Sequence, residues 1–290
     1  MNYNNNTHCY NFEERHYSDG LLKNIDATYI IHLENNGRLS AIEEQLMKYH
    51  PSNRVFIVFN KGYKKCKKDL IQENTVYDLI DANLNAIQHS IDNDYKTILI
   101  LEDDFQFNEI INKEEITNEL DSFIMENQNK SFLYYLGAIP LLKICWSYHQ
   151  NVFSSLGTHS VVISDLMKTK LIENRRKAND WDLYLNSFKL CRYMYHIPLC
   201  YQTFPETENQ KNWGITEKIM GISYSVFREP GKFLLNQLDM DKKPEPGFTI
   251  TYYLSIFIFL FVCILFIFIC YTLYIWIKER VKKIGKKNNK

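Results

Sequence analysis

The sequence predicts an α/β domain with a largely parallel sheet, followed by one membrane-spanning helix. Short apolar runs alternate with helical patterns over most of the first 200 residues, which is typical of such a sheet. One of these runs, TILIL, leads directly into three carboxylates, Glu102, Asp103 and Asp104. Near the end of the chain, residues 248–277 contain no charged side chain. These three observations define the fold class and the candidate site.

The elements follow from the pattern in chain order. Strands are expected at 28–33, 54–59, 97–102, 132–138, 159–164 and 193–198, and helices at 40–49, 75–92, 165–173 and 182–190. Ser40 and Glu43 have the spacing of a capping box at the start of the first helix. Thr75 is the expected N-cap of the second helix, whose apolar residues recur at helical spacing.

The chain divides into five parts. Residues 1–24 have no apolar core of the signal-peptide type and are expected to be a disordered lead. The α/β domain spans 25–235, and the sequence DKKPEPG indicates a helix-breaking linker within 236–247. Residues 248–277 exceed the roughly 20 residues needed to cross a bilayer. A basic tail, 278–290, ends the chain.

The chain is therefore expected in a membrane, held by a single C-terminal span. The N-terminal and C-terminal segments indicate opposite orientations of the chain across that membrane. The tail has seven Lys or Arg and one Glu, which favours a cytosolic C-terminus. The absence of an N-terminal leader favours a cytosolic body with a tail anchor. The side of the membrane on which the body lies therefore stays open at this point.

Charge and cysteine usage exclude some classes of protein. Residues 1–277 carry 27 basic and 33 acidic side chains, so the body lacks the basic surface that nucleic-acid binding requires. Five cysteines lie outside the apolar segment and form no C-x-x-C pair. They are expected to be free, mostly buried thiols, and a structural zinc site is not expected.

The three carboxylates indicate a metal site. A strand with apolar side chains on both faces is buried, and ligands of open α/β sheets bind beyond the carboxyl ends of the strands. Adjacent carboxylates repel one another, and a hard divalent cation such as Mn²⁺ or Mg²⁺ relieves that repulsion. A solvated acidic loop is the simpler alternative. A phosphatase of the haloacid-dehalogenase type would need Asp where this chain has Glu102.

With this cluster in place, the chain resembles GT-A-fold glycosyltransferases, most closely family 25, which includes lipopolysaccharide glycosyltransferases and procollagen galactosyltransferases. The resemblance covers about residues 25–215 and rests on stretches in the family's order. These are ATYIIHLENNGRLSAIEEQL, ANLNAIQHSIDNDYKTILILEDDFQF, FLYYLG, GTHSVVIS, NDWDLYLN and HIPLCYQ. It implies a Rossmann-like domain that binds a nucleotide-sugar, expected to be UDP-linked, as donor.

The resemblance also implies roles for particular residues. Glu102 and Asp104 would hold Mn²⁺ or Mg²⁺ against the donor's phosphates, and His32, Arg38 and Asp103 would lie near the nucleotide. Family 25 enzymes invert the anomeric centre, so a general base must deprotonate the acceptor hydroxyl. The candidates are Asp182, which is preferred, and Asp180. The acceptor could be a glycan, a lipid-linked molecule or a protein.

Other interpretations stay open. A degenerate GT-A module could serve as a membrane-attached binding or structural protein without catalysis. A metal-dependent nucleotidyltransferase would carry a Gly-rich basic loop after its first strand, and ENNGR is a poor version of one. His159 and His196 are interpreted as core or edge histidines, with His196 as a possible third metal ligand.

Overall fold

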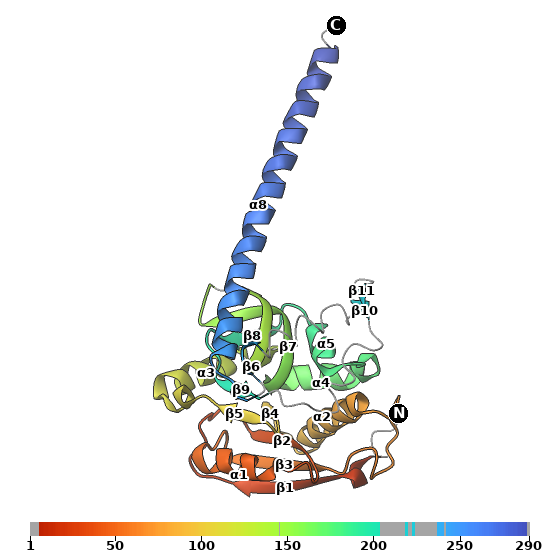
Figure 1. Ribbon diagram of the computed structural model, residues 1–290, viewed down its shortest axis with the longest axis vertical. Helices are drawn as coiled ribbons and strands as arrows, with labels where there is room; N and C mark the ends of the chain where they lie inside the picture. Colours follow the sequence, from red (N-terminus) through yellow and green to blue (C-terminus); the bar gives the residue numbers. More distant parts are fainter. Residues whose placement is uncertain are drawn as a thin grey trace.

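A computed structural model shows a mixed α/β body and one long C-terminal helix that projects from it (Figure 1). It describes residues 6–144, 146–203, 218–219, 222–223, 237–240 and 242–288. The predicted end of the domain at residue 235 lies outside these residues. Among them, one helix is long and apolar enough to span a membrane.

A seven-stranded sheet in the order β1-β3-β2-β4-β7-β6-β8 forms the centre of the body. Its strands are β1 (Tyr10–His16), β2 (Ala27–Leu33), β3 (Arg54–Asn60), β4 (Ile98–Glu102), β6 (Leu133–Ile144), β7 (His149–Ile163) and β8 (Arg192–Tyr195). Smaller sheets pair β5 (Phe105–Phe107) with β9 (Cys200–Gln202), and β10 (Lys218–Ile219) with β11 (Ile222–Ser223). The expected parallel pairing is present in β3-β2-β4 and between β6 and β8. β1, by contrast, is antiparallel to β3, and β7 is antiparallel to β4 and β6.

Helices cover both faces of this sheet. They are α1 (Leu39–Lys48), α2 (Thr75–Asp92), α3 (Glu114–Asn127), α4 (Asp165–Asn174) and α5 (Trp181–Asn186), with short 3-10 turns at Thr7–Cys9, Glu109–Asn112 and Arg175–Lys177. Successive residues of β2 point to opposite faces: Tyr29 packs in the cluster with α2, α4 and α5, and Ile30 in the cluster with α1 and α3. Burial on both faces explains the uninterrupted apolar runs.

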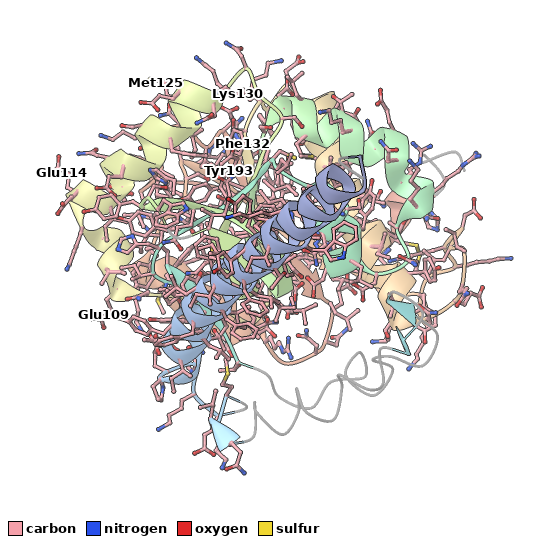
Figure 2. All side chains as sticks on the ribbon, turned by 90° about the horizontal axis from the view of Figure 1, so that it is seen from above. Glu109, Glu114, Met125, Lys130, Phe132 and Tyr193 are labelled. Atoms are coloured by element: carbon pink, nitrogen blue, oxygen red, sulfur yellow. A yellow bond between two sulfur atoms is a disulfide. The ribbon has the colours of Figure 1, made fainter. Side chains whose placement is uncertain are left out.

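Figure 2, seen from above, shows α3 at the outer edge of the body, with Glu114 and Met125 labelled along it. Phe132 and Tyr193 lie inside this edge. The ring of Phe123 on α3 lies 5.7 Å from the Phe132 ring and 5.0 Å from the Tyr193 ring, centroid to centroid. These aromatic contacts hold α3 against the sheet beside β8.

Two predicted helix caps are wrong. α1 begins at Leu39 with Arg38 as N-cap, and that cap makes no side-chain hydrogen bond, so Ser40 lies inside the helix. Glu43 is instead bound by Arg15, at 2.5 and 2.7 Å. α2 is capped by Asn74, whose side chain accepts from the amide of Tyr77. Asn74 has the extended backbone of an N-cap, whereas Thr75 is the first helical residue.

The N-terminal segment is not a disordered lead over residues 10–16, because β1 pairs there with all of β3. The prediction of free cysteines is also wrong for one pair: Cys9 and Cys66 form a disulfide with a Cα–Cα distance of 5.7 Å. This disulfide links the chain just before β1 to the segment between β3 and α2. Spacing along the chain could not reveal it, because 57 positions separate the two cysteines.

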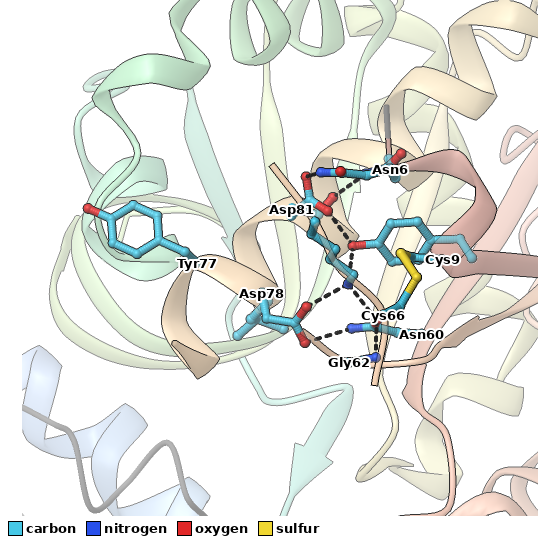
Figure 3. Close-up of polar contacts among 12 residues, drawn as sticks. Asn6, Cys9, Asn60, Gly62, Cys66, Tyr77, Asp78 and Asp81 are labelled. Carbon is cyan, nitrogen blue, oxygen red and sulfur yellow. Dashed lines mark hydrogen bonds and ion pairs between the residues drawn. A yellow bond between two sulfur atoms is a disulfide. The ribbon is translucent and has the colours of Figure 1, made fainter. Parts of the chain in front are cut away.

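Buried polar contacts support the same junction (Figure 3). The ammonium of Lys68 donates to Asp78 at 2.5 Å, Asn60 at 2.6 Å and the Tyr10 hydroxyl at 2.7 Å. Tyr10 in turn donates to Asp81 at 2.5 Å. Burial lowers the pKa of Lys68 against the opposing effect of Asp78, and each charged group here has a partner, as interior charges require. Together with the disulfide, this network holds β1 at the sheet edge.

The long helix α8 (Gly247–Asn288) begins one residue before the predicted span, but it is not separate from the body. Its first turns are buried, with Phe248, Thr251, Tyr252 and Ser255 at 0–5% exposure. Phe248 packs against the rings of His159 and Tyr201, at 5.5 Å from each. Pro244 and Pro246 lie just before this helix, where their carbonyls accept from the amides of Phe248 and Ile250, and the helix is docked against β6.

Candidate functional site

The parallel alignment of β2 with β4 brings two polar segments together where both strands end. Ile31 is in register with Glu102, so the residues that follow each strand lie side by side. His32 therefore faces the acidic segment although 71 positions separate it from Asp103. The carboxyl edge of the parallel strands is where ligands of open α/β sheets bind.

Asp103 is turned toward the loop after β2. Its carboxylate accepts from His32 Nδ1 at 3.2 Å, from the Leu33 amide at 3.3 Å and from the Asn36 side chain. Arg38 Nη1 donates to the other oxygen at 2.7 Å. Burial alone would raise the pKa of Asp103, but His32 and Arg38 outweigh it and the pKa is lowered. Asp103 is thus a fixed anion that organises this loop.

Arg38 also contacts the next carboxylate. Its Nη1 donates to Asp104 Oδ2 at 3.0 Å, so one guanidinium nitrogen bridges Asp103 and Asp104. The side chains of both aspartates are 9% exposed, and that of Arg38 is 27% exposed. The structure therefore brings together five of the predicted site residues: His32, Arg38, Glu102, Asp103 and Asp104.

Gln202 is a member of the site that the sequence did not single out. β9 pairs antiparallel with β5, and Phe105 is in register with Gln202. This pairing places Gln202 Nε2 3.2 Å from Glu102 Oε2 and 3.0 Å from Asp104 Oδ1. Gln202 is the last residue of the motif HIPLCYQ, and its place in that motif is the sequence feature that could have identified it as a site residue. The neighbouring Tyr201 packs on Phe248, so the site adjoins the start of α8.

The remaining acids repel one another. The pKa of Glu102 is raised well above its usual value, first by burial and then by the charges of Asp104 and Asp182. Burial also raises the pKa of Asp104 to about 6, although Arg38 lowers it. Like charges held in a poorly solvated place favour either protonation or a cation. Two carboxylates here are therefore incompletely compensated by the described side chains.

The structure separates the two candidate bases. Asp180 is the N-cap of α5, and its side chain accepts from the amide of Leu183 at 2.9 Å. Asp182 accepts from the amides of Gly157 and Thr158 on β7, at 2.8 and 2.9 Å. Burial raises the pKa of Asp182 despite these hydrogen bonds, and its charge acts on Glu102. Asp182 is thus electrostatically part of the acidic cluster.

Within the described part of the chain, His159 and His196 make no hydrogen bond to Glu102, Asp103 or Asp104. His159 is 1% exposed, and its ring nitrogens lie 2.8 Å from the Gly157 carbonyl and 3.1 Å from the Cys200 carbonyl. Burial lowers its pKa to about 4, as for an interior histidine. His196 packs on the rings of Tyr148 and Tyr195. It makes no hydrogen bond to Glu102 or Asp104 within the described part of the chain.

A cavity of about 370 Å³ adjoins the cluster. His32 lines it and also contacts Asp103, so cavity and carboxylates share a wall. The loop after β2 and the start of α1 supply most of its lining, and Phe59 from β3 adds an aromatic face; the lining residues are His32, Glu34, Asn35, Gly37, Leu39, Ser40 and Phe59. Asn35 and Gly37 have φ of 64° and 81°, a conformation that Asn and Gly adopt most readily. The loop therefore curves around the cavity.

The donor set beside the cavity fits a hard cation. Glu102 and Asp104 offer carboxylate oxygens, and Gln202 Oε1 is buried without a hydrogen-bond partner among the described residues. The two carboxylates are ligands that suit Mg²⁺ or Mn²⁺, and Gln202 presents its amide nitrogen to both of them. Among the described residues, the group of three His, Cys, Asp or Glu side chains whose donor atoms lie close enough to share a metal is His8, Cys9 and Cys66, and not Glu102, Asp103 and Asp104. Both cysteines of that group are consumed by the disulfide.

Replacing Gln202 tests this donor set. We expect Gln202→Leu to weaken Mn²⁺ binding about 10- to 100-fold, because the variant loses the hydrogen bonds that orient both carboxylates. Titration of the full chain in detergent, followed by Mn²⁺ electron paramagnetic resonance, measures the affinity. Gln106→Leu on the adjacent β5 is the matched control and should bind as the wild type does. Equal affinities in all three proteins would remove Gln202 from the site.

Comparisons with known proteins add little to this geometry. No family model matches the chain, and no curated protein matches it. Among solved structures, the crystal structure of A197 from STIV is similar to 61% of this chain and 85% of its own, with 13% sequence identity and a TM-score of 0.40. The fold and site thus define a mixed α/β protein with one apolar C-terminal helix.

Proposed function

We propose that the chain is a membrane-anchored, metal-dependent glycosyltransferase that moves a hexose from a nucleotide-sugar to an acceptor hydroxyl with inversion. The observation that carries the proposal is the pair of carboxylates, Glu102 and Asp104, which the Gln202 amide holds together beside the cavity after β2. A bound Mn²⁺ or Mg²⁺ would neutralise the donor's diphosphate as it departs. The resemblance to family 25 supports the same assignment.

The chain's own residues have distinct tasks in this proposal. Glu102 and Asp104 hold the cation, and the Gln202 amide orients both carboxylates. Arg38 contacts Asp104 and lies in the chain between the cavity-lining residues Gly37 and Leu39, and in this proposal its guanidinium donates to a phosphate. The nucleoside then occupies the cavity, against Phe59 and the loop after β2. A UDP-sugar is the proposed donor, and a glycan, a lipid-linked molecule or a protein is the acceptor.

Asp182 is the proposed general base. Its raised pKa brings it closer to the range in which a carboxylate accepts a proton effectively, and its two backbone contacts fix its orientation. Asp180 is committed to capping α5. The two aspartates can therefore be distinguished although only Trp181 separates them in the chain.

We expect Asp182→Asn to reduce sugar transfer about 100-fold or more while leaving UDP binding unchanged. An Asn side chain has one acceptor oxygen for the two amides, so the variant should also lose about 1–3 kcal/mol of stability. Asp180→Asn is the control, because Asn caps helices as well as Asp does. Transfer assays and thermal unfolding measure the two effects. Full activity of Asp182→Asn would exclude it as the base.

A thermal-shift screen tests the function itself. The full chain in detergent is heated with UDP-, GDP-, CMP- and dTDP-sugars, with and without Mn²⁺. Stabilisation by one donor class that requires Mn²⁺ supports the proposal, and so does slow donor hydrolysis. The full chain is preferable to a form that ends at residue 245, because Phe248 and Tyr252 pack into the body. No shift with any donor would contradict the proposal.

The bridge from Arg38 to both aspartates favours a second candidate. An internal guanidinium already supplies one positive charge where the cation would bind. A degenerate module, held together by this ion pair, would act as a non-catalytic binding or structural protein at the membrane. Such a module would show no Mn²⁺-dependent shift, and Arg38→Ala would destabilise it rather than expose a metal site.

For localisation, we propose that the body lies outside the cytosol and the basic tail inside it. The Cys9–Cys66 disulfide is of the kind that persists in oxidising compartments. The tail's Lys and Arg residues point to the same orientation through the positive-inside tendency. Protease protection in sealed membranes tests it: the body should be cleaved from outside intact cells or protected inside sealed microsomes.

A further inference from the structure

Among the residues of the body that the structure describes, the tip of the β6–β7 hairpin has the most exposed aromatic side chains. Trp146 and Tyr148 are 78% and 60% exposed, although aromatic side chains of this size are usually buried. Leu141 and Phe153, on the two strands of the same hairpin, are 40% and 36% exposed. The tip, defined here as residues 146–148, therefore continues an apolar surface that the body does not cover.

This tip lies against the C-terminal helix. The Trp146 ring meets the Phe259 ring edge-on, with centroids 5.6 Å apart. Further down the hairpin, the Lys143 ammonium lies 4.2 Å from the centre of the Tyr252 ring, and Lys143 is fully buried. Two contacts thus hold the hairpin beside α8. The contact between Trp146 and Phe259, at the tip, is the one farther from the centre of the body (Figure 1).

The position of Phe259 defines the depth of the tip. Ser255 is the last fully buried residue of α8, and side chains from Phe257 onward are largely exposed. Residues 256–277 extend about 33 Å at about 1.5 Å per residue, close to the ~30 Å of a hydrocarbon core. If α8 crosses a membrane with this stretch, Phe259 lies about one turn inside its near boundary. Trp146, in contact with Phe259, then lies at that boundary.

We propose that the β6–β7 hairpin tip is a second membrane contact, with Trp146 and Tyr148 seated in the interfacial region of the same bilayer that α8 spans. Their amphipathic rings suit this region, where Trp and Tyr gather in membrane proteins. The occupant of the exposed surface is lipid, because the surface is continuous with the lipid-facing side of α8. The proposal rests on α8 crossing a membrane and is independent of glycosyl transfer.

Depth-dependent fluorescence quenching tests this contact. The full chain and its W146F variant are reconstituted in phosphatidylcholine vesicles with and without lipids brominated near the top of the acyl chain. The Trp146 signal is the difference between the two proteins, which cancels Trp181, Trp213 and Trp276. We expect brominated lipid to remove at least half of this signal. Phe replaces Trp146 on an exposed surface, so the variant should fold normally.

Met47→Trp in the W146F background is the matched control, because Met47 is 76% exposed on α1, at the end of the body opposite α8 (Figure 1). Its added emission should be insensitive to brominated lipid. The proposal is overturned if Trp146 is quenched no more than Trp at position 47. In that case, a shift of the Trp146 emission as the protein is diluted in the membrane would indicate that a second copy of the chain covers this surface. No shift would indicate that water covers it.

Discussion

Asp104→Asn should abolish Mn²⁺-dependent hydrolysis of the UDP-sugar, a loss of about 100-fold or more. The substitution removes one charged ligand from the proposed cation and leaves an amide in its place. It also removes one of the two carboxylates that Arg38 bridges, while Asp103 keeps its own contacts with Arg38 and His32. The fold should therefore persist. Donor hydrolysis and Mn²⁺ affinity of the full chain measure the effect.

A pH series provides the control for folding. The pKa of Asp104 is raised to about 6 in the folded protein, above the ~3.9 of an unfolded chain. The group therefore adds stability below about pH 4, and this contribution is lost as the pH rises through 6. Metal-free wild type should lose stability between about pH 4 and 6, and Asp104→Asn should lose less. Retained hydrolysis in a folded Asp104→Asn protein would remove the metal assignment.

Reducing the Cys9–Cys66 disulfide should lower stability by about 2–4 kcal/mol, because it releases a long loop in the unfolded chain. For a body of this size the midpoint of thermal unfolding should fall by about 5–15 °C. The effect should be local at first, with β1 and the chain around Lys68 exchanging amide hydrogens faster. Thermal unfolding and hydrogen exchange, with and without reductant, measure both.

Two serine variants sharpen this test. Cys9→Ser should reproduce the reduced state and should be insensitive to reductant. Cys191→Ser, at a free and half-buried cysteine, should resemble the wild type under both conditions. If wild type has the same unfolding midpoint with and without reductant, the disulfide contributes nothing to stability. The assignment of the body to an oxidising compartment would then lose its main support.

The interior of the sheet was predictable from the sequence. β2, β3 and β4 are buried on both faces, so their apolar runs stand out without any knowledge of their neighbours. The same runs locate the carboxylates, because a buried strand that ends in acids must present them at the sheet edge. The positions of Arg38 and His32 beside these acids follow from the parallel alignment of β2 with β4.

Features that depend on distant partners were not predictable. β1 is an edge strand with Glu13, Glu14 and Arg15 in its middle, and only pairing with β3 makes it regular. Gln202 reaches the site through the β5–β9 pairing, 98 positions from Asp104. The direction of Asp103, toward the loop instead of the other acids, depends on hydrogen bonds from that loop. The spacing of residues along the sequence does not indicate contacts of this kind.

The bridge formed by Arg38 has a consequence for the order in which ligands bind. A cation and the Arg38 guanidinium compete for the same carboxylate of Asp104. A diphosphate that draws Arg38 toward itself frees Asp104 for the cation, so under the proposed function each ligand should strengthen the binding of the other. Thermodynamic linkage makes this cooperativity reciprocal. Mn²⁺ affinity should rise with UDP and UDP affinity with Mn²⁺, by one common factor that disappears in Arg38→Ala.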